Sequence, residues 1–197
     1  MQILLIRHGE SEADILKVHE GRADYPMTDR GRAQARKMAR HVLEKFPPDI
    51  IWASTLKRAS ETAEILQSAI NCPIHFLDEL REHNNGNLAG QPDHIGPFPW
   101  ELQPHEKHGE IGESHIEFRG RAEQVFSYIR NQSQDHKRIA IVCHGGMISR
   151  LMESFLQTPV VQNLWTLSGD TAIHLIEFTP RGRLIHFTNN TNHLNDE

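Results

Sequence analysis

Two short apolar runs constrain what this chain can fold into more than any other feature of its sequence. They are Ile3 to Ile6 and "RIAIVC", Arg138 to Cys143. A strand with one solvated face alternates between apolar and polar residues, whereas a continuous run is typical of a strand buried on both faces. We therefore expect a sheet covered on both sides.

Segments with apolar residues at helical spacing alternate with these runs. The predicted elements are a strand over 3–6, a helix capped by Thr28, a strand over 50–54, a helix opened by Ser54 or Thr55, a strand over 74–77, a helix whose capping box is Ser114 with Glu117, a strand over 138–143, a helix in "HGGMISRLMESFL", and two final strands joined by a Pro-Gly turn. This order predicts the α/β class, a three-layer α/β/α sandwich with a mostly parallel central sheet and an antiparallel addition. With no repeat or linker, we expect one domain over 1–197.

Composition excludes several functional classes. The net charge is −5 and no block of lysine and arginine stands out, which argues against nucleic-acid or membrane-surface binding. Two cysteines are too few for a disulfide framework, and no leader or long apolar span is visible, so we expect a cytoplasmic protein with reduced thiols. The 14 histidines lack ligand-like spacing, so we expect no metal and no cofactor. The choice between a monomer and a homodimer stays open.

A histidine and a glycine follow each of the two apolar runs. These are His8 with Gly9, and His144 with Gly145. One histidine after a strand is usually a solvated surface residue, but ligands of open α/β sheets bind beyond the carboxyl ends of the strands. Two histidines at that edge, each beside a glycine that permits close backbone approach, indicate a binding site.

Two arginines belong to the same pattern. Arg7 precedes His8, and Arg58 lies in the first turn of the helix after the strand over 50–54. A guanidinium stays charged and binds phosphate through two parallel hydrogen bonds. Either arginine alone would be a common surface ion pair. Together with the two histidines they indicate a phosphate pocket.

Six motifs, in order, resemble the histidine phosphatase superfamily, the phosphoglycerate-mutase-like group, and its phosphatase branch. They are "LIRHGES", "MTDRGRAQA", "IIWASTLKRASETA", "LDELREHNNGNLAG", "GES" at 112–114 and "AIVCHGGMI", followed by a similar tail, "TNNTNHL". The resemblance covers nearly the whole chain.

The resemblance implies a role for five residues. His8 would be the nucleophile that forms a phosphohistidine, while Arg7, Arg58 and His144 would hold the phosphoryl oxygens. Glu82 would protonate the leaving oxygen and then activate water, which needs a carboxyl whose pKa is raised by burial. The expected phosphate and substrate contacts are Arg7, His8, Gly9, Asp14, Glu20, Gly21, Arg58, Glu82, His144 and Gly145.

The chain departs from the family pattern at several positions, including Leu88-Ala89-Gly90 in place of a frequent Trp-Glu-Gly. Asp14 stands where Asn is frequent, and Glu20, beside Gly21, stands where Gln is frequent. Both acids either select a substrate with cationic or hydroxyl groups or point elsewhere. Cys143 replaces a frequent Ser or Thr, and at the end of a buried strand we expect an inert thiol.

Residues 83–112 follow neither the helical nor the strand period, which suggests a lid or pocket wall. Lys107 is the only lysine or arginine among them, whereas five apolar residues offer contact: Leu88, Ile95, Phe98, Trp100 and Leu102. We therefore expect a metal-independent phosphomonoesterase acting on a small phosphorylated metabolite with an uncharged or apolar body. The alternatives are a phosphoglycerate-type phosphomutase, which needs more cations here, and a non-catalytic phosphate-binding module.

Overall fold

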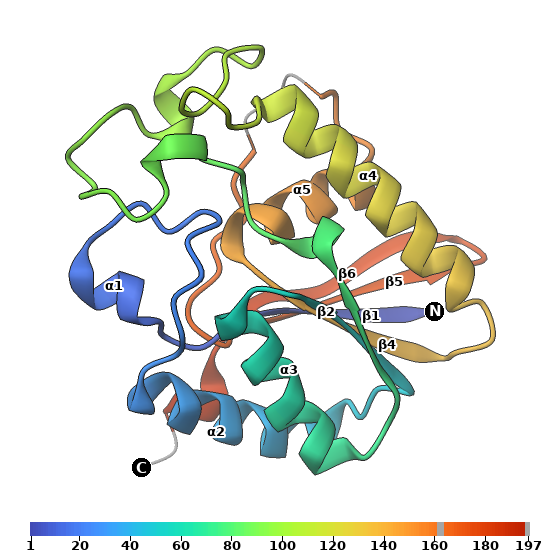
Figure 1. Cartoon of the computed structure of the whole chain (residues 1–197). Helices are drawn as coiled ribbons and strands as arrows, with labels where there is room; N and C mark the ends of the chain where they lie inside the picture. Colours follow the sequence, from blue (N-terminus) through green and yellow to red (C-terminus); the bar gives the residue numbers. More distant parts are fainter. Residues whose placement is uncertain (161–163, 196–197) are drawn as a thin grey trace.

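The computed structural model describes residues 1–160 and 164–195, and a mixed sheet of six strands forms its centre (Figure 1). The strand order is β3-β2-β4-β1-β5-β6. The first four strands are parallel, β5 pairs antiparallel with β1, and β6 pairs antiparallel with β5. The strands are β1 Gln2–Arg7, β2 Ile50–Ser54, β3 Ile74–Leu77, β4 Arg138–Cys143, β5 Ile173–Thr179 and β6 Gly182–Asn190. The predicted mostly parallel sheet with an antiparallel addition is confirmed.

Helices cover both faces of the sheet. In Figure 1, α2 (Asp29–Lys45) and α3 (Lys57–Ile70) lie on one side, and α4 (His115–Gln132) and α5 (Gly145–Leu156) on the other. The short α1 (Glu12–Leu16) follows β1 and was not expected from the sequence. The layers confirm the predicted α/β/α sandwich.

The alternation of side chains along β1 explains why its sequence is apolar throughout. Successive residues of a strand point to opposite faces. Leu4 and Ile6 pack with apolar residues of α2 and α3, whereas Ile3 and Leu5 pack with those of α4 and α5. All four are fully buried, so each face of the strand belongs to a core of its own.

The helix starts match the predicted caps, with one exception. Thr28 accepts a hydrogen bond from the Gly31 N–H, and Ser114 forms a capping box with Glu117. The prediction that Ser54 or Thr55 opens α3 is wrong, because Leu56 occupies the N-cap. Ser54 is the last residue of β2, and its hydroxyl is committed to the Leu56 N–H and to the ring of His144.

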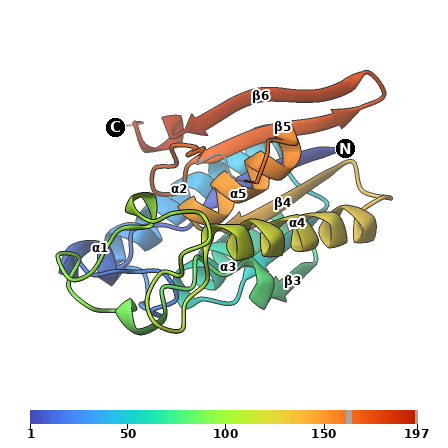
Figure 2. The same ribbon diagram turned by 90° about the horizontal axis from the view of Figure 1, so that it is seen from above.

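Residues 83–112 gather at the end of the sheet where β1 and β4 finish. They contain short 3-10 turns at Gly86–Leu88 and Pro99–Glu101 but no α-helix or named strand. Figure 2 shows the green and yellow-green segment beside α1, at the end of the molecule away from the N-terminus. The hairpin of β5 and β6 forms one edge of the sheet. Pro180 and Arg181 make its turn and Gly182 opens β6, so the two predicted strands are confirmed while the glycine of the predicted Pro-Gly turn belongs to the strand.

Candidate active site

The register of the sheet brings the two histidines together. β1 and β4 are neighbours, with Arg7 opposite Cys143, so His8 and His144 follow at the same edge. The His8 N–H donates to the Cys143 carbonyl at 3.0 Å, and the two rings have centroids 5.1 Å apart. Both side chains are buried. The sheet therefore holds the two imidazoles in a fixed mutual arrangement.

The contacts of His8 determine which ring nitrogen carries the proton. Its Nδ1 lies 2.8 Å from the Gly9 carbonyl oxygen, which can only accept a hydrogen bond, so Nδ1 is the donor. Nε2 then keeps a lone pair and accepts from Arg58 Nε at 3.2 Å. Burial, with help from Arg58 and Arg7, lowers the His8 pKa well below 6.5. His8 is therefore neutral near pH 7, with the electron pair of Nε2 facing Arg58.

His144 has one ring nitrogen that lacks a partner among the described residues. Nε2 lies 2.8 Å from the Ser54 hydroxyl, while Nδ1 is buried without a hydrogen bond. Burial is the main cause that lowers its pKa well below 6.5, with Arg58 and His8 adding to it. A buried polar atom without a partner costs free energy, so this nitrogen is suited to a ligand atom.

Arg58 is fully buried, and the loop before α2 orients its guanidinium. Nη1 donates to the Ala23 carbonyl at 2.9 Å and Nη2 to the Gly21 carbonyl at 2.8 Å. Nε is left to face His8 and, at 3.1 Å, the carboxylate of Glu20. All three nitrogens of the Arg58 guanidinium thus have protein partners that fix its orientation.

Gly21 lets this loop approach Asn85 closely. Its φ is +40°, and a Cβ there would lie 2.2 Å from the Asn85 side chain. Asn85 Oδ1 accepts from the Arg22 N–H at 3.2 Å, and Asn85 Nδ2 donates to the His19 carbonyl at 3.4 Å. Because Gly21 also holds Arg58, Asn85 supports the position of the guanidinium.

Arg7 approaches the cluster from the end of β1. Its Nη1 donates to the Ser168 carbonyl at 2.8 Å. Its Nη2 lies 3.5 Å from the Asp170 carboxylate and 3.7 Å from that of Asp14. Burial raises the pKa of Asp170, although the charge of Arg7 opposes the shift. The chain thus surrounds Arg7 with acids.

Glu82 is half-buried, and two backbone N–H groups hold its carboxyl group. Oε1 accepts from His83 and Oε2 from Gly146, each at 2.8 Å. Burial raises the Glu82 pKa above 4.5, while the two N–H groups and Arg58 pull it down. The site therefore favours the protonated carboxyl more than water does.

The glycines that follow the histidines differ in how closely the protein packs around them. A Cβ at Gly9 would lie 2.5 Å from the Gly31 carbonyl oxygen, so the protein itself needs a glycine there. At Gly145 the nearest atom would be Arg7 Cδ at 4.0 Å, so the protein leaves space beside this backbone. The crowded position is the next one, since a Cβ at Gly146 would lie 2.5 Å from the carboxyl oxygen of Glu82.

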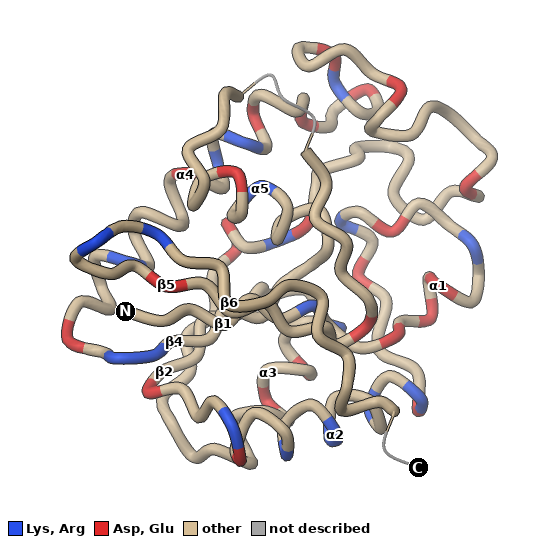
Figure 3. The backbone as a smooth tube through the Cα atoms, turned by 180° about the vertical axis from the view of Figure 1, so that it is seen from behind, with Lys and Arg blue, Asp and Glu red and all other residues tan. Residues whose placement is uncertain are grey.

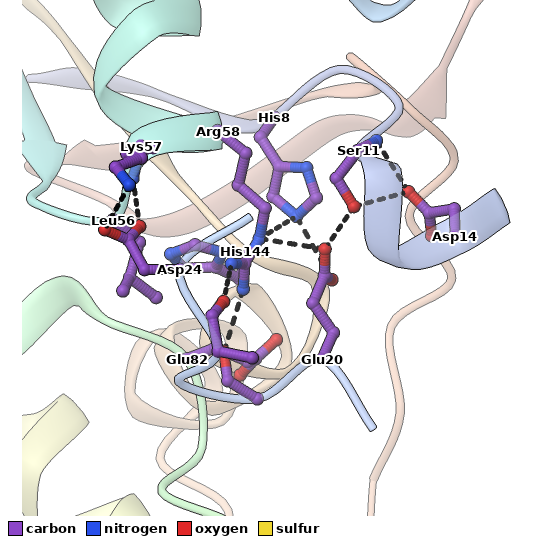
Figure 4. A network of polar contacts seen from close by, with 12 residues as sticks. His8, Ser11, Asp14, Glu20, Asp24, Leu56, Lys57, Arg58, Glu82 and His144 are labelled. Atoms are coloured by element: carbon purple, nitrogen blue, oxygen red, sulfur yellow. Dashed lines mark hydrogen bonds and ion pairs between the residues drawn. The ribbon is translucent and has the colours of Figure 1, made fainter. Parts of the chain in front are cut away.

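Asp14 and Glu20 point into the cluster and not away from it (Figure 4). Asp14 Oδ2 accepts from the Ser11 N–H at 2.8 Å and lies 3.0 Å from the Ser11 hydroxyl oxygen. Glu20 accepts from the Ser11 hydroxyl at 2.5 Å, and its other oxygen lies 3.8 Å from His8 Nε2. The sequence left open whether these acids select a substrate or point away from the site. The structure excludes the second option.

A cavity of about 260 Å³ opens beside this cluster. Glu20, Glu82 and Gly146 line the end next to the histidines. Phe98 and Trp100 line it from the 83–112 segment, and their rings stack with centroids 4.5 Å apart. Trp100 meets Trp165, another lining residue, edge to face at 6.2 Å. An aromatic wall thus adjoins the proposed phosphate position.

Sequence reasoning missed several residues of the site. Ser54, Gly146 and Asp170 each contact a predicted site residue, and Asn85 packs closely against Gly21, as described above. Ser54, Asn85 and Gly146 lie within the quoted motifs, so their place in those motifs was an available signal. For Asp170, in a polar stretch before β5, the sequence carries no signal that we can name.

Three further observations concern chemistry that the chain could otherwise support. In the described residues, no group of three or more His, Cys, Asp or Glu side chains is placed to hold a metal ion. Burial raises the pKa of the Cys143 thiol, in line with the inert thiol expected at this strand end. Within the same residues, no helix has both the length and the apolar character needed to cross a membrane.

Comparison with known proteins places this geometry in a family. Residues 3–191 match the histidine phosphatase superfamily (branch 1). The uncharacterized phosphatase PhoE of Bacillus subtilis is 32% identical over 152 residues, 76% of this chain and 75% of that protein. The adenosylcobalamin/alpha-ribazole phosphatase of Salmonella typhimurium is 29% identical, with 84% of each chain covered. A phosphoserine phosphatase of Entamoeba histolytica, solved with phosphoserine, has a TM-score of 0.82 and 25% identity and covers 98% of each chain.

The chain therefore belongs to the histidine phosphatase superfamily. Its relatives in this comparison include phosphatases whose names specify phosphorylated small molecules, such as phosphoserine and alpha-ribazole phosphate. The fold is that of phosphoglycerate-mutase-like phosphatases.

Proposed function

We propose that the protein is a metal-independent phosphomonoesterase that forms a phosphohistidine on His8. The observation that carries the proposal is the tautomer of His8: Nδ1–H is held by the Gly9 carbonyl, and the lone pair of Nε2 faces Arg58. A neutral imidazole in this orientation would be a nucleophile, and Arg58 and His144 lie beside it. Metal ions supply positive charge in other phosphatases, and here Arg7 and Arg58 would supply it.

The first half-reaction transfers the phosphoryl group to the protein. The Nε2 electron pair forms the N–P bond while the bond between phosphorus and the ester oxygen breaks. That oxygen takes the proton of the Glu82 carboxyl group and leaves as the alcohol. Glu82 suits the step because its pKa is raised and because Gly146 and His83 fix both carboxyl oxygens.

The second half-reaction returns the protein to its starting state. The Glu82 carboxylate takes a proton from a water molecule whose oxygen attacks phosphorus. The N–P bond breaks, its electron pair returns to His8 Nε2, and inorganic phosphate leaves. Arg7, Arg58 and the Nδ1–H tautomer of His144 would stabilise the charge on the phosphoryl oxygens in both steps.

The cavity supports a substrate with a small, uncharged body that contains an aromatic ring. Its aromatic wall is formed by Phe98, Trp100 and Trp165, and planar rings stack on such surfaces. Arg150 is the only arginine or lysine among the described lining residues, and its Nη1 and Nη2 already contact His115 and the Leu164 carbonyl. A substrate that carries a carboxylate in addition to its phosphate would therefore find few hydrogen-bond donors for that carboxylate. We propose that residues 83–112 form the wall of this pocket.

A phosphoglycerate-type mutase is the main alternative, and the position of Lys107 counts against it. Lys107 is the only lysine or arginine of residues 83–112, and its Nζ pairs with Glu117 at 2.9 Å instead of lining the cavity. A mutase must hold the carboxylate of its substrate and keep water away from the phosphohistidine. This pocket offers no spare cation for the first task among its described lining residues.

The proposal is tested by measuring phosphate release from a panel of aryl, nucleoside and short-chain alkyl phosphates in the presence of EDTA. In parallel, 3-phosphoglycerate with a 2,3-bisphosphoglycerate primer is assayed for isomer formation. We expect His8-dependent hydrolysis, with the aryl esters preferred, and little isomerisation. Isomerisation faster than hydrolysis would replace phosphatase by mutase, and loss of activity in EDTA that Zn²⁺ or Mg²⁺ restores would contradict the metal-independent mechanism. A protein that binds phosphate without turnover would support the non-catalytic module.

A further inference from the structure

The carboxylate of Glu20 lies among the groups that the proposed function assigns to phosphate. One oxygen lies 3.1 Å from Arg58 Nε and accepts from the Ser11 hydroxyl, and the other lies 3.8 Å from His8 Nε2 (Figure 4). His8 Nε2 is the atom that would meet phosphorus. A carboxylate and a phosphoryl group use the same donors, so Glu20 holds an anion where the substrate must bring one.

The charges around Glu20 explain its position. Arg58 is fully buried, and a buried guanidinium without a counter-ion is strongly unfavourable. Glu20 is the nearest carboxylate to its Nε, whereas Asp14 is bonded to Ser11 and Glu82 to two backbone N–H groups. Glu20 therefore neutralises Arg58 in the ligand-free protein.

The same charges make Glu20 an obstacle to phosphate. A phosphoryl group at His8 would need the Nε of Arg58 and would lie beside the Glu20 carboxylate, and adjacent like charges in a partly desolvated site repel strongly. Acidic residues are already dense here, as the red segments at and beside α1 show in Figure 3.

Glu20 has space to move. Its side chain retains 21% of its exposure, and it lines the cavity that opens beside the histidines. Its contacts to Ser11 and Arg58 are made by the side chain alone, so a change of rotamer releases both. The loop that holds Arg58 through the carbonyls of Gly21 and Ala23 need not move.

We propose that Glu20 is an internal competitor of phosphate: its carboxylate occupies the phosphate position in the ligand-free protein and must leave Arg58 before a phosphate ester can bind. This inference rests on the proposed function of the same site. It predicts that Glu20 lowers the affinity for phosphate while it stabilises the protein in the absence of phosphate. It also predicts that the return of Glu20 to Arg58 assists release of the product phosphate. The frequent Gln of the family pattern would lack this effect because an amide is uncharged.

The test compares the wild-type protein with Glu20→Gln by titrating inorganic phosphate in a calorimeter at one pH and ionic strength. Glu20→Gln keeps the shape of the side chain and removes its charge. The control is Glu61→Gln, which removes the same charge from α3, three residues beyond Arg58, where Glu61 pairs with Arg32 at 2.6 Å. We expect Glu20→Gln to bind phosphate about tenfold more tightly or better, and Glu61→Gln to bind it as the wild type does.

Thermal melting gives a second readout that a merely structural role would not produce. Without phosphate, Glu20→Gln should melt at a lower temperature than the wild type, because Arg58 loses its counter-ion. With saturating phosphate the difference in melting temperature should shrink toward zero, since the variant gains more from the ligand. Phosphate affinity in Glu20→Gln equal to or weaker than that of the wild type would overturn the inference while leaving the phosphatase proposal intact. If neither protein binds phosphate and neither hydrolyses any ester of the panel, the proposed function fails as well.

Discussion

At the scale of single residues, one physical cause prepares both proposed reactants. Burial disfavours the charged form of any group, so it lowers the pKa of His8 and raises that of Glu82. A nucleophilic imidazole must be neutral and an acid catalyst must be protonated. The desolvation of this pocket is the largest cause of both shifts and favours both states in the same pH range, and the charges of Arg58 and Arg7 add to the shift of His8.

These two shifts predict the pH dependence of kcat/KM for an alkyl phosphate. Activity should fall as the pH rises through the raised pKa of Glu82, because the acid is then lost. It should also fall as the pH drops through the His8 pKa, which lies well below 6.5, because the nucleophile is then protonated. The measurement is a kcat/KM profile from about pH 4 to 9, which spans the ordinary pKa values of Glu and His.

Replacement of Glu82 distinguishes the alkaline limb of the pH profile from the acidic limb. Glu82→Gln should lower kcat for an alkyl phosphate by about 10²- to 10⁴-fold, the usual contribution of a positioned proton donor. The oxygen of a phenolic ester is a good leaving group and needs less protonation. The variant should therefore lose much less kcat with this ester, and the alkaline limb of its pH profile should flatten. Equal losses for the two esters would show that Glu82 is not the proton donor.

At the scale of elements, the site depends on how the loop before α2 is held against the segment after β3. Asn85 bonds to the backbone of His19 and of Arg22, and Gly21 between them accepts from Arg58. Neither segment has regular structure at these positions. Side-chain to backbone hydrogen bonds therefore replace a sheet ladder in fixing the distance between them.

Loss of these bonds should weaken substrate binding more than it slows the chemistry. Asn85→Ala removes two hydrogen bonds, each worth about 0.5–1.5 kcal/mol, so we expect KM for the preferred ester to rise about tenfold with a smaller change in kcat. Asn87→Ala is the matched control, because Asn87 lies two residues further on and bonds to the Glu110 N–H instead. A KM that rises equally in both variants would mean that the effect is general loosening of the loop.

At the scale of the whole molecule, the fold was more accessible from the sequence than the detail of the site. The continuous apolar runs predicted doubly covered strands because burial on both faces leaves a direct pattern in composition, and Leu4 and Ile3 do enter separate cores. Parallel pairing of β1 with β4 then placed His8 beside His144. The pattern of strand-end histidines and two arginines already indicated Arg58 as a phosphate contact, whereas the role of Glu82 needed the family resemblance, since nothing local distinguishes it from a surface charge.

What the sequence did not predict depends on distances between segments remote in the chain. The tight approach lies at Gly146 and not at Gly145, because the Glu82 carboxyl group arrives from another loop. The N-cap of α3 is Leu56 and not Ser54, because Ser54 still belongs to β2 and pairs with Leu77 of β3. The direction of Glu20 depends on the buried charge of Arg58, which no pattern of neighbouring residues reveals.

The central claim is that His8 becomes phosphorylated during turnover, and direct detection of the intermediate tests it. The protein is mixed with a fast aryl phosphate, quenched within milliseconds in alkali, which preserves phosphohistidine, and the phosphorylated residue is located by mass spectrometry, with His8→Ala as the control. We predict an acid-labile, alkali-stable phosphoryl group on His8 that forms and decays at the rate of turnover, and a folded His8→Ala variant with neither label nor activity. A label on another residue, or turnover in His8→Ala close to the wild-type rate, would contradict the account.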